Sequence, residues 1–378
     1  MKKITAILLI LLMLWTQPAF AENSAEGVWC VMEQRSGQVI TGSREQEQRF
    51  PAGLTKLMSF LLFFEALDAG EVQKTAMVTV SENAASKGGT SVFLDAGAAY
   101  PFEDLLRAAV VSSGNDATTA LAEHMAGSEE AFVERMQKSA GEMGLSCVFA
   151  DATGLSTETR ASAKELAAIA AELAEHSGFF EYSGIWTYTF VHENGRETEL
   201  TSSNKLIKSE VYDGMATGSS KDAGYCLAAS MPQNGSHFLC IVMNAENSDQ
   251  RFSTASGLLG TAAAAYMPYD IVEKGAKVKN VSISGAKQKE ITLYAAEDLS
   301  LLLPKDQDIE KTIHLREDLK APLSAGERAG ELIVTASDGT KYSVALVVAE
   351  EIPESSLRGS LSRIMGLWLS RGTGASAA

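Results

Sequence analysis

Three short segments of the sequence carry side chains whose types and order could form one site. Residues 51–56 (PAGLTK) hold Lys56 at the start of an apolar stretch, a second segment holds Ser113 and Asn115, and residues 213–218 (DGMATG) form the third. Burial among apolar groups disfavours a charged lysine, so its neutral amine becomes able to accept a proton. A hydroxyl becomes an effective nucleophile only beside such a base. Lys56 is therefore the candidate base of this site.

The order of the three segments resembles that of penicillin-binding proteins and serine β-lactamases, which use Ser-x-x-Lys, Ser-x-Asn and Lys-Thr-Gly. The flanking runs PAxLTKLM, SSGNDATTALAEHMAG, ATGL, SSNKLI, DGMxTG and AGYCLAAS resemble the low-molecular-weight, serine-type D-alanyl-D-alanine carboxypeptidases over residues 25–350. A Ser-Gly-Asn second motif with a β domain behind it favours the peptidases over the lactamases.

The resemblance implies a role for each matching position. In that family a serine and a lysine one helical turn apart face the same cleft. Ser113 would relay protons and Asn115 would hold a substrate amide. The strand with Thr217 and Gly218 would bind the terminal carboxylate. Backbone N–H groups at position 53 and at Ser219 would hold the developing oxyanion.

Two positions depart from the family pattern. Gly53 stands at the nucleophile position and Ala216 at the lysine of the third motif. Loss of a catalytic serine costs on the order of 10⁶ in turnover. Loss of a charge-assisted hydrogen bond to a carboxylate costs roughly 1.5–3 kcal/mol. Since these losses affect different steps, we expect a catalytically impaired pseudoenzyme rather than a working hydrolase.

Other residues offer weaker substitutes for the missing groups. Residues 202–205 and 284–287 also fit Ser-x-x-Lys, and we interpret both as accidental matches. Ser59 lies six residues after Gly53, which predicts a different helical face. Lys221 would reach the site only if the turn after the third segment folded back.

The retained residues also have a structural interpretation. Lys56 could persist because its ammonium group binds Ser113 and Asn115, since buried charges persist only when they are paired. The segment from Thr217 to Gly218 could simply end a strand. Gly53 could be a helix N-cap.

The elements that position these segments follow from hydrophobic periodicity. Hairpins are predicted where short β-prone runs flank turn residues, and helices where apolar residues recur every three or four positions. The predicted elements are a hairpin of 28–32 and 38–41, a buried helix at 54–67, helices at 102–111, 116–125, 129–143 and 163–175, and an antiparallel pair of 225–230 and 237–244. Helices on an antiparallel sheet make an α+β domain. The resemblance identifies it with the penicillin-binding/β-lactamase-like transpeptidase fold.

The cysteines and histidines indicate neither a metal site nor a cofactor. Cys30, Cys147, Cys226 and Cys240 show no Cys-x-x-Cys spacing, and the five histidines are scattered. A chain of this length can bury a core without disulfides, which favours buried free thiols, with one bridge as the alternative.

The ends of the chain suggest export. Residues 1–21 have a basic start, an apolar run and Ala19-Phe20-Ala21, which is typical of a cleaved signal peptide, with a retained N-terminal anchor as the alternative. Cleavage removes two lysines and no acid, so the formal net charge moves from −16 to −18. That charge argues against nucleic acid as a partner.

The predicted domains are 22–270, carboxypeptidase-like, 271–351, a small all-β domain, and 352–378, a tail. Six apolar tail residues share one helical face beside three arginines, which is typical of an interfacial membrane helix. The six are Leu357, Leu361, Ile364, Met365, Trp368 and Leu369. The alternative is a helix packed on the β domain.

Three hypotheses for function remain. The first is a pseudoenzyme at the outer face of the membrane that binds peptidoglycan stem peptides or cell-wall enzymes. The second is an active D-alanyl-D-alanine carboxypeptidase that trims the terminal D-Ala of peptidoglycan pentapeptides. The third is a structural envelope protein with a vestigial cleft.

Overall fold

The computed structural model describes residues 27–305, 307–337 and 339–355. Its chain divides into two compact units. The first contains the described residues up to Met32, then 39–231 and 238–265. The second contains 33–38, 232–237 and the described residues from Tyr266 onward. The boundary placed after residue 270 from the sequence falls inside strand β10 (Tyr266–Val272), which pairs with β13 (Leu299–Pro304).

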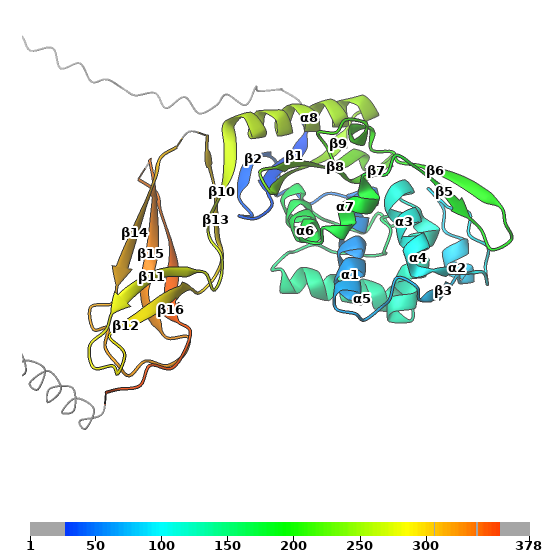
Figure 1. Cartoon of the computed structure of the whole chain (residues 1–378). Coiled ribbons are helices and arrows are strands. Elements are labelled where there is room, and N and C mark those ends of the chain that lie inside the picture. The colour runs from blue at the N-terminus through cyan, green and yellow to red at the C-terminus, as the bar shows by residue number, and fades with distance from the viewer. Residues whose placement is uncertain (1–26, 306, 338, 356–378) are drawn as a thin grey trace, which may run out of the picture. The chain divides into compact units, whose positions relative to one another are not determined.

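The first unit is built around a five-stranded antiparallel sheet in the order β2-β1-β9-β8-β7 (Figure 1). Its strands are β1 (Val28–Glu33), β2 (Val39–Ser43), β7 (Gly214–Ser220), β8 (Gly224–Gln233) and β9 (Ser236–Ala245). Two short pairs lie apart from it: β3 (Met77–Thr79) with β4 (Ala99–Pro101), and β5 (Thr187–Val191) with β6 (Glu197–Thr201). The edge strand β7 carries the third motif.

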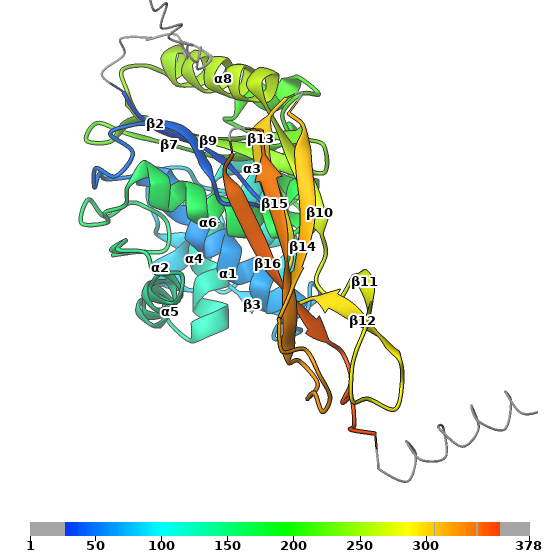
Figure 2. The ribbon, with the colours of Figure 1, turned by 90° about the vertical axis from the view of Figure 1, so that its left-hand side faces the viewer.

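Helices cover both faces of this sheet. Helix α8 (Ser248–Ala265) lies on one face and the other helices lie on the opposite face, so the unit has three layers (Figures 1 and 2). The opposite layer contains α1 (Lys56–Asp68), α2 (Glu82–Ala85), α3 (Phe102–Ser112), α4 (Asn115–Ala126), α5 (Glu129–Glu142), α6 (Ala163–Glu175) and α7 (Gly178–Ser183). Two 3-10 helices, η1 (Ala52–Thr55) and η2 (Lys205–Lys208), complete the unit.

Helix α1 is the centre of the helical layer, as its composition predicted. Its side chains are buried from Lys56 through Phe64, because apolar residues surround the helix on all sides. Burial of each large apolar side chain contributes roughly 1.5–3 kcal/mol. The cost of placing a lysine in this helix is therefore offset by its neighbours. Lys56, the last residue of the first motif segment, is thus held in a helix that is buried in the core of the unit.

The second unit is an all-β domain. Its main sheet has the order β11-β12-β16-β15-β14, and β10 pairs with β13 beside it (Figure 2). The strands of the main sheet are β11 (Lys277–Ser282), β12 (Glu290–Ala295), β14 (Ile309–Leu315), β15 (Arg328–Ala336) and β16 (Lys341–Val348). Alternating residues such as Leu332, Val334 and Ala336 form a separate hydrophobic core.

The cysteines agree with the expectation from the sequence. All four cysteines are buried and carry free thiols. Burial raises the pKa of the thiols of Cys30 and Cys147 to about 12 and that of Cys226 to about 11.

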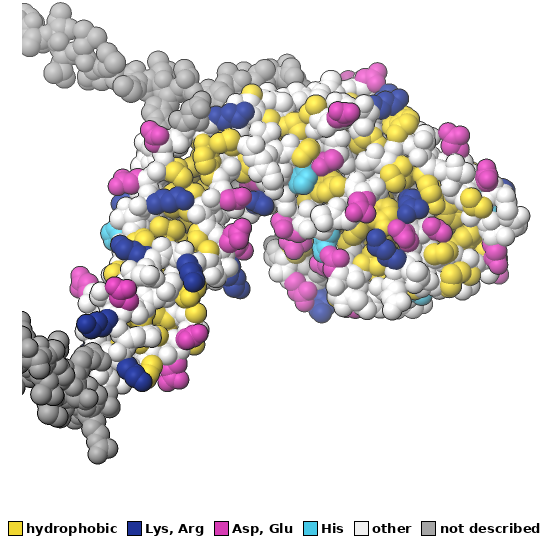
Figure 3. All heavy atoms as spheres, in the orientation of Figure 1, with side chains coloured by type: hydrophobic (Ala, Val, Ile, Leu, Met, Phe, Trp, Pro, Cys, Tyr) yellow, Lys and Arg dark blue, Asp and Glu magenta, His cyan; other side chains and the backbone are white. Residues whose placement is uncertain are grey.

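Acidic and basic side chains are interspersed over the face shown in Figure 3. Within the described ranges, no helix has the length and apolar character needed to cross a bilayer.

Candidate active site

A cavity of about 340 Å³ in the first unit brings the three motif segments together. The positions expected from the sequence that line it are Gly53, Lys56, Ser113, Asn115, Thr217, Gly218 and Ser219. Ala216 belongs instead to the main hydrophobic core and is only 8% exposed. The described residues contain no cluster of three or more metal-ligating side chains.

Lys56 is held by a loop rather than by the second motif. Its Nζ donates to the carbonyl oxygen of Thr153 at 2.8 Å. The pairing with Ser113 and Asn115 that the structural interpretation suggested is not among the hydrogen bonds of Lys56 in the described residues, and the acceptor lies in a loop 97 residues away in the chain. Complete burial lowers the pKa of Lys56 to about 8, and the nearby carboxylate of Asp151 opposes that shift. A lysine with this pKa can exchange a proton near neutral pH.

Gly53 lies against the backbone of β7, which leaves no room for a side chain. A Cβ placed on Gly53 would lie 2.7 Å from the Thr217 carbonyl oxygen and 3.1 Å from Gly218 Cα. A Cβ on Gly218 would in turn lie 2.6 Å from Gly53 N. Gly53 is also not an N-cap, since it lies inside η1, and Pro51 caps η1 while Thr55 caps α1. The two glycines therefore allow η1 and β7 to approach closely.

The second motif sits where α3 ends and α4 begins. Ser113 adopts a left-handed backbone with φ 60° as the C-cap of α3. The Asn115 side chain donates from Nδ2 to the Gly88 carbonyl oxygen at 2.7 Å. The backbone N–H of Asn115 donates to the Thr90 carbonyl oxygen at 2.8 Å. Asn115 thus fixes the loop beside the cavity.

Three non-glycine residues with strained backbones lie at or near this cavity. Ala52, Ser113 and Met215 are non-glycine residues with φ of 46°, 60° and 142°. Each lies in the cavity lining or directly beside a lining residue or motif position. Gly154 has φ +82°, and a Cβ there would lie 1.8 Å from the Ala52 carbonyl oxygen. Strain of this kind costs about 1–3 kcal/mol per residue and concentrates at functional sites.

Among the polar lining residues that the sequence analysis did not assign to the site, two contact β7. Ser203 lines the cavity and its Oγ is hydrogen-bonded to Thr217 Oγ1. Arg251, only 6% exposed, donates from Nη1 to the carbonyl oxygens of Gly218 (3.2 Å) and Cys226 (3.0 Å). The run SSNKLI contained the first residue. Arg251 is a lone arginine in a stretch of small residues, so no sequence motif indicated that it belongs to the site.

The serines and lysines considered as substitutes from the sequence do not line the cavity: Ser59, Ser202, Lys205 and Lys221 are all outside its lining. Ser59 donates to the Ala152 carbonyl oxygen at 2.6 Å inside the core. Lys205 is exposed and pairs with Asp249 at 3.4 Å. Lys221 is exposed and does not line the cavity. The second Ser-x-x-Lys match, residues 284–287, lies in the second unit.

Comparison with known proteins gives this arrangement a family. The profile of the D-alanyl-D-alanine carboxypeptidase family matches residues 16–247, which is more than half of the chain. The chain belongs to this family. The profile of the C-terminal domain of penicillin-binding protein 5 matches residues 266–354. The fold is therefore the penicillin-binding, transpeptidase-like α+β domain followed by an all-β domain, as the sequence predicted.

Relatives within the family align over nearly the whole chain. The D-alanyl-D-alanine carboxypeptidase DacF of Bacillus subtilis (strain 168) is 31% identical over 386 residues, covering 97% of this chain and 99% of the relative. The carboxypeptidase DacD of Escherichia coli (strain K12) is 30% identical over 348 residues, covering 89% of each. The crystal structure of penicillin-binding protein 5 from Haemophilus influenzae superposes with a TM-score of 0.78 at 28% identity, covering 86% of this chain and 97% of the other.

Proposed function

We propose that this carboxypeptidase-like protein binds peptidoglycan stem peptides in its cavity without forming an acyl-enzyme. The observation that carries the proposal is the contact of Gly53 with the backbone of β7. A serine at this position would overlap the Thr217 carbonyl oxygen, because even its Cβ would lie 2.7 Å away. Acyl transfer by a serine requires a hydroxyl beside the base. The cavity supplies Lys56 as base but no hydroxyl at position 53.

Several groups of the cavity suit a peptide that ends in a carboxylate, and among the described residues Asp222 is the one acidic residue in the cavity lining. Lys56 and Arg251 are cationic groups in the cavity lining at neutral pH, since the pKa of Lys56 stays at about 8. Ser203 and Thr217, whose hydroxyls are hydrogen-bonded to each other, and Ser219 add polar groups to the lining along β7. Charge-assisted hydrogen bonds of this type contribute about 1.5–3 kcal/mol each. Recognition can therefore persist where acylation does not.

Two measurements on the mature protein test this proposal. Titration calorimetry with diacetyl-L-Lys-D-Ala-D-Ala should show saturable binding, and the matched peptide ending in L-Ala-L-Ala should bind at least tenfold more weakly. Intact-mass spectrometry after incubation with benzylpenicillin should show no adduct. A covalent adduct on any serine, or equal binding of the two peptides, would contradict the proposal.

An active carboxypeptidase is the second candidate. It is favoured by the relatives, which are named carboxypeptidases and which align over 99% and 89% of their length. It is also favoured by the lowered pKa of Lys56, which lines the same cavity as Ser113. Release of free D-alanine from the D-Ala-D-Ala peptide at a rate abolished by Lys56→Met would establish it. The same assay without release would favour binding alone.

We also propose that the protein acts at the outer face of the membrane. The proposed signal peptide and most of the amphipathic tail lie outside the described residues, so the sequence carries this proposal. The family membership supports it, since its substrate is in the cell envelope. Three arginines near the surface would each add roughly 1 kcal/mol of attraction to anionic lipids. Flotation with vesicles of phosphatidylglycerol and phosphatidylcholine should recover the mature chain but not a chain that ends at Ser355.

A further inference from the structure

Two segments of the cavity lining have no helix or strand of their own. Loop 86–98 joins α2 to β4 and supplies Gly89 and Thr90, and turn 151–156, between α5 and α6, supplies Thr153, Gly154 and Leu155. Segments whose backbone is not hydrogen-bonded into a helix or a sheet unfold locally at a low free-energy cost unless side chains hold them in place. The width of the cavity therefore depends on the contacts of these two segments.

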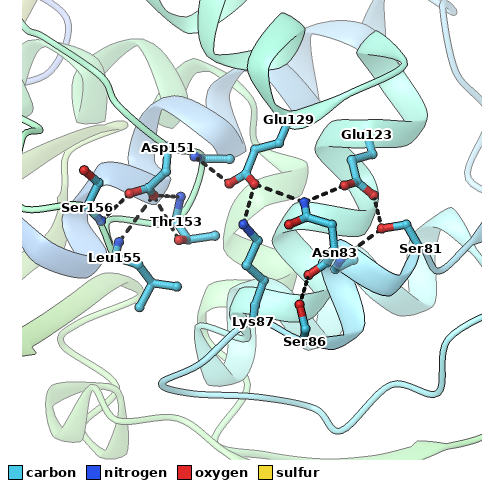
Figure 4. Close-up of polar contacts among 12 residues, drawn as sticks. Ser81, Asn83, Ser86, Lys87, Glu123, Glu129, Asp151, Thr153, Leu155 and Ser156 are labelled. Carbon is cyan, nitrogen blue, oxygen red and sulfur yellow. Dashed lines mark hydrogen bonds and ion pairs between the residues drawn. The ribbon is translucent and has the colours of Figure 1, made fainter.

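Each segment is organised around one carboxylate. Asp116 accepts hydrogen bonds from Ser91 Oγ (2.7 Å) and from the N–H groups of Val92 (2.9 Å) and Leu94 (3.1 Å). Asp151 accepts the N–H groups of Thr153, Gly154, Leu155 and Ser156 and thereby closes turn 151–156 on itself (Figure 4). These contacts shape each segment but do not join one segment to the other.

Glu129 contacts both segments at once. It is the first residue of α5, and its Oε2 pairs with Lys87 Nζ of loop 86–98 at 2.5 Å. Its Oε1 accepts the N–H of Ala152 in turn 151–156 at 3.4 Å. Figure 4 shows the Glu129 carboxylate between the Lys87 ammonium and the backbone beside Asp151. A single carboxylate thus bridges two segments that line the cavity.

The bridge is largely removed from solvent and is anchored on its far side. The side chains of Lys87 and Glu129 are 19% and 9% exposed. Asn83 Nδ2 donates both to Glu129 Oε2 (3.2 Å) and to Glu123 Oε1 (2.7 Å), which ties the bridge to α4. Removing one partner of such a pair leaves a buried charge without compensation, unlike the removal of an exposed pair.

We propose that Glu129 is a positioning residue that couples loop 86–98 to turn 151–156 and so sets the affinity of the cavity for its ligand. The part of the proposal that concerns affinity rests on the proposed function in stem-peptide binding. The coupling extends to the base of the site, because the Thr153 carbonyl oxygen in the same turn holds Lys56 at 2.8 Å.

Hydrogen–deuterium exchange of the mature protein tests the coupling without any ligand. Lys87→Met removes a contact of loop 86–98 only. If Glu129 couples the segments, exchange should accelerate by about tenfold both at residues 87–94 and at residues 152–156. Acceleration confined to residues 87–94 would overturn the proposal. Unchanged exchange in β8 and β9 would show that the variant remains folded.

Two further variants separate coupling from a loss of stability. Lys87→Arg keeps the charge, and its exchange should match that of the unaltered protein. Lys138→Met is the matched control, because Lys138 forms an exposed pair with Glu142 on the same helix at 3.5 Å. That variant should leave both segments unchanged. If Lys87→Met does not fold, Lys87→Gln, which keeps a hydrogen-bond donor, must show the same double acceleration at smaller size.

Affinity provides the second measurement. Calorimetry with diacetyl-L-Lys-D-Ala-D-Ala should give a Kd for Lys87→Met about tenfold weaker than that of the unaltered protein, and Lys87→Arg should restore it. An unchanged Kd together with accelerated exchange in both segments would overturn the role of Glu129 in affinity. If the unaltered protein fails to bind the peptide, the proposed function fails, while the exchange experiment still decides the coupling.

Discussion

The close approach of η1 and β7 makes a sharp prediction about Gly53. In Gly53→Ala the new methyl carbon would lie 2.7 Å from the Thr217 carbonyl oxygen. Real Cβ atoms essentially never approach another heavy atom to less than 3.0 Å. The neighbour is backbone of a sheet strand and cannot rotate away. Forcing an extra carbon into a packed region costs typically about 1–3 kcal/mol. We therefore expect Gly53→Ala to lower the unfolding free energy by this amount.

Gly260 on α8 is a matched control, and its replacement by alanine should change the unfolding free energy in the opposite direction. A Cβ on Gly260 meets no atom within 4 Å, and the residue lies five positions before the end of its helix. Glycine to alanine at an open helical site stabilises by about 0.4–1 kcal/mol, because the unfolded chain loses freedom. Urea unfolding of both variants should therefore separate them by roughly 1.5–4 kcal/mol.

The same geometry bears on repair of the missing nucleophile. Gly53→Ser should be destabilised like Gly53→Ala and should form no adduct with benzylpenicillin in intact-mass spectrometry. If Gly53→Ala unfolds at the same urea concentration as the unaltered protein, or Gly53→Ser is acylated to completion, η1 and β7 separate readily and the steric reasoning is refuted.

Three other predictions concern the groups around the cavity and the tail. Because the pKa of Lys56 is lowered from 10.5 to about 8, the unfolded chain binds more protons between these values. The unfolding free energy of the unaltered protein relative to Lys56→Met should therefore rise from pH 8 to 10, and parallel curves in urea titrations would contradict this. Asp151→Ala should cost about 2–4 kcal/mol in the same assay, since it leaves several backbone N–H groups without an acceptor. Asp249→Ala should cost less than about 1 kcal/mol, because Asp249 is exposed and its pair with Lys205 lies at the surface. A chain ending at Ser355 should move from washed membranes to the soluble fraction, and retention on the membrane would place the anchor elsewhere.

Much of the first unit could be predicted from hydrophobic periodicity. The apolar stretch that became α1, the paired helices α3 and α4 and the hairpin of β8 and β9 each have a strong local pattern. Helix α8 was not predicted. Its buried face consists largely of small residues around Phe252 and Leu259, and Gly257 and Gly260 interrupt its helical propensity. Its position on the sheet supplies the stabilisation that its sequence lacks.

The motif positions of the cavity were read from the sequence, but their partners were not. Lys56 and the Thr153 carbonyl oxygen are 97 residues apart, and Glu129 and Lys87 are 42 apart. Such contacts form through irregular loops, whose paths carry no periodic signal. The overlap at Gly53 likewise depends on how closely η1 approaches β7, which only the assembled backbone determines. Spacing along the chain can indicate which side chains meet but not the distance between backbones.

The buried cysteines make this chain a convenient host for site-directed labelling. With pKa values of about 11 to 12 for Cys30, Cys147 and Cys226, the thiolate that reacts with maleimides is on the order of one part in ten thousand or less at pH 7. Burial also removes all four sulfur atoms from contact with the reagent. A cysteine introduced at the exposed Leu155, on the rim of the cavity, would therefore take up a fluorophore selectively in the otherwise unaltered protein. Occupancy of the cavity could then be followed by fluorescence without replacing any native residue of the core.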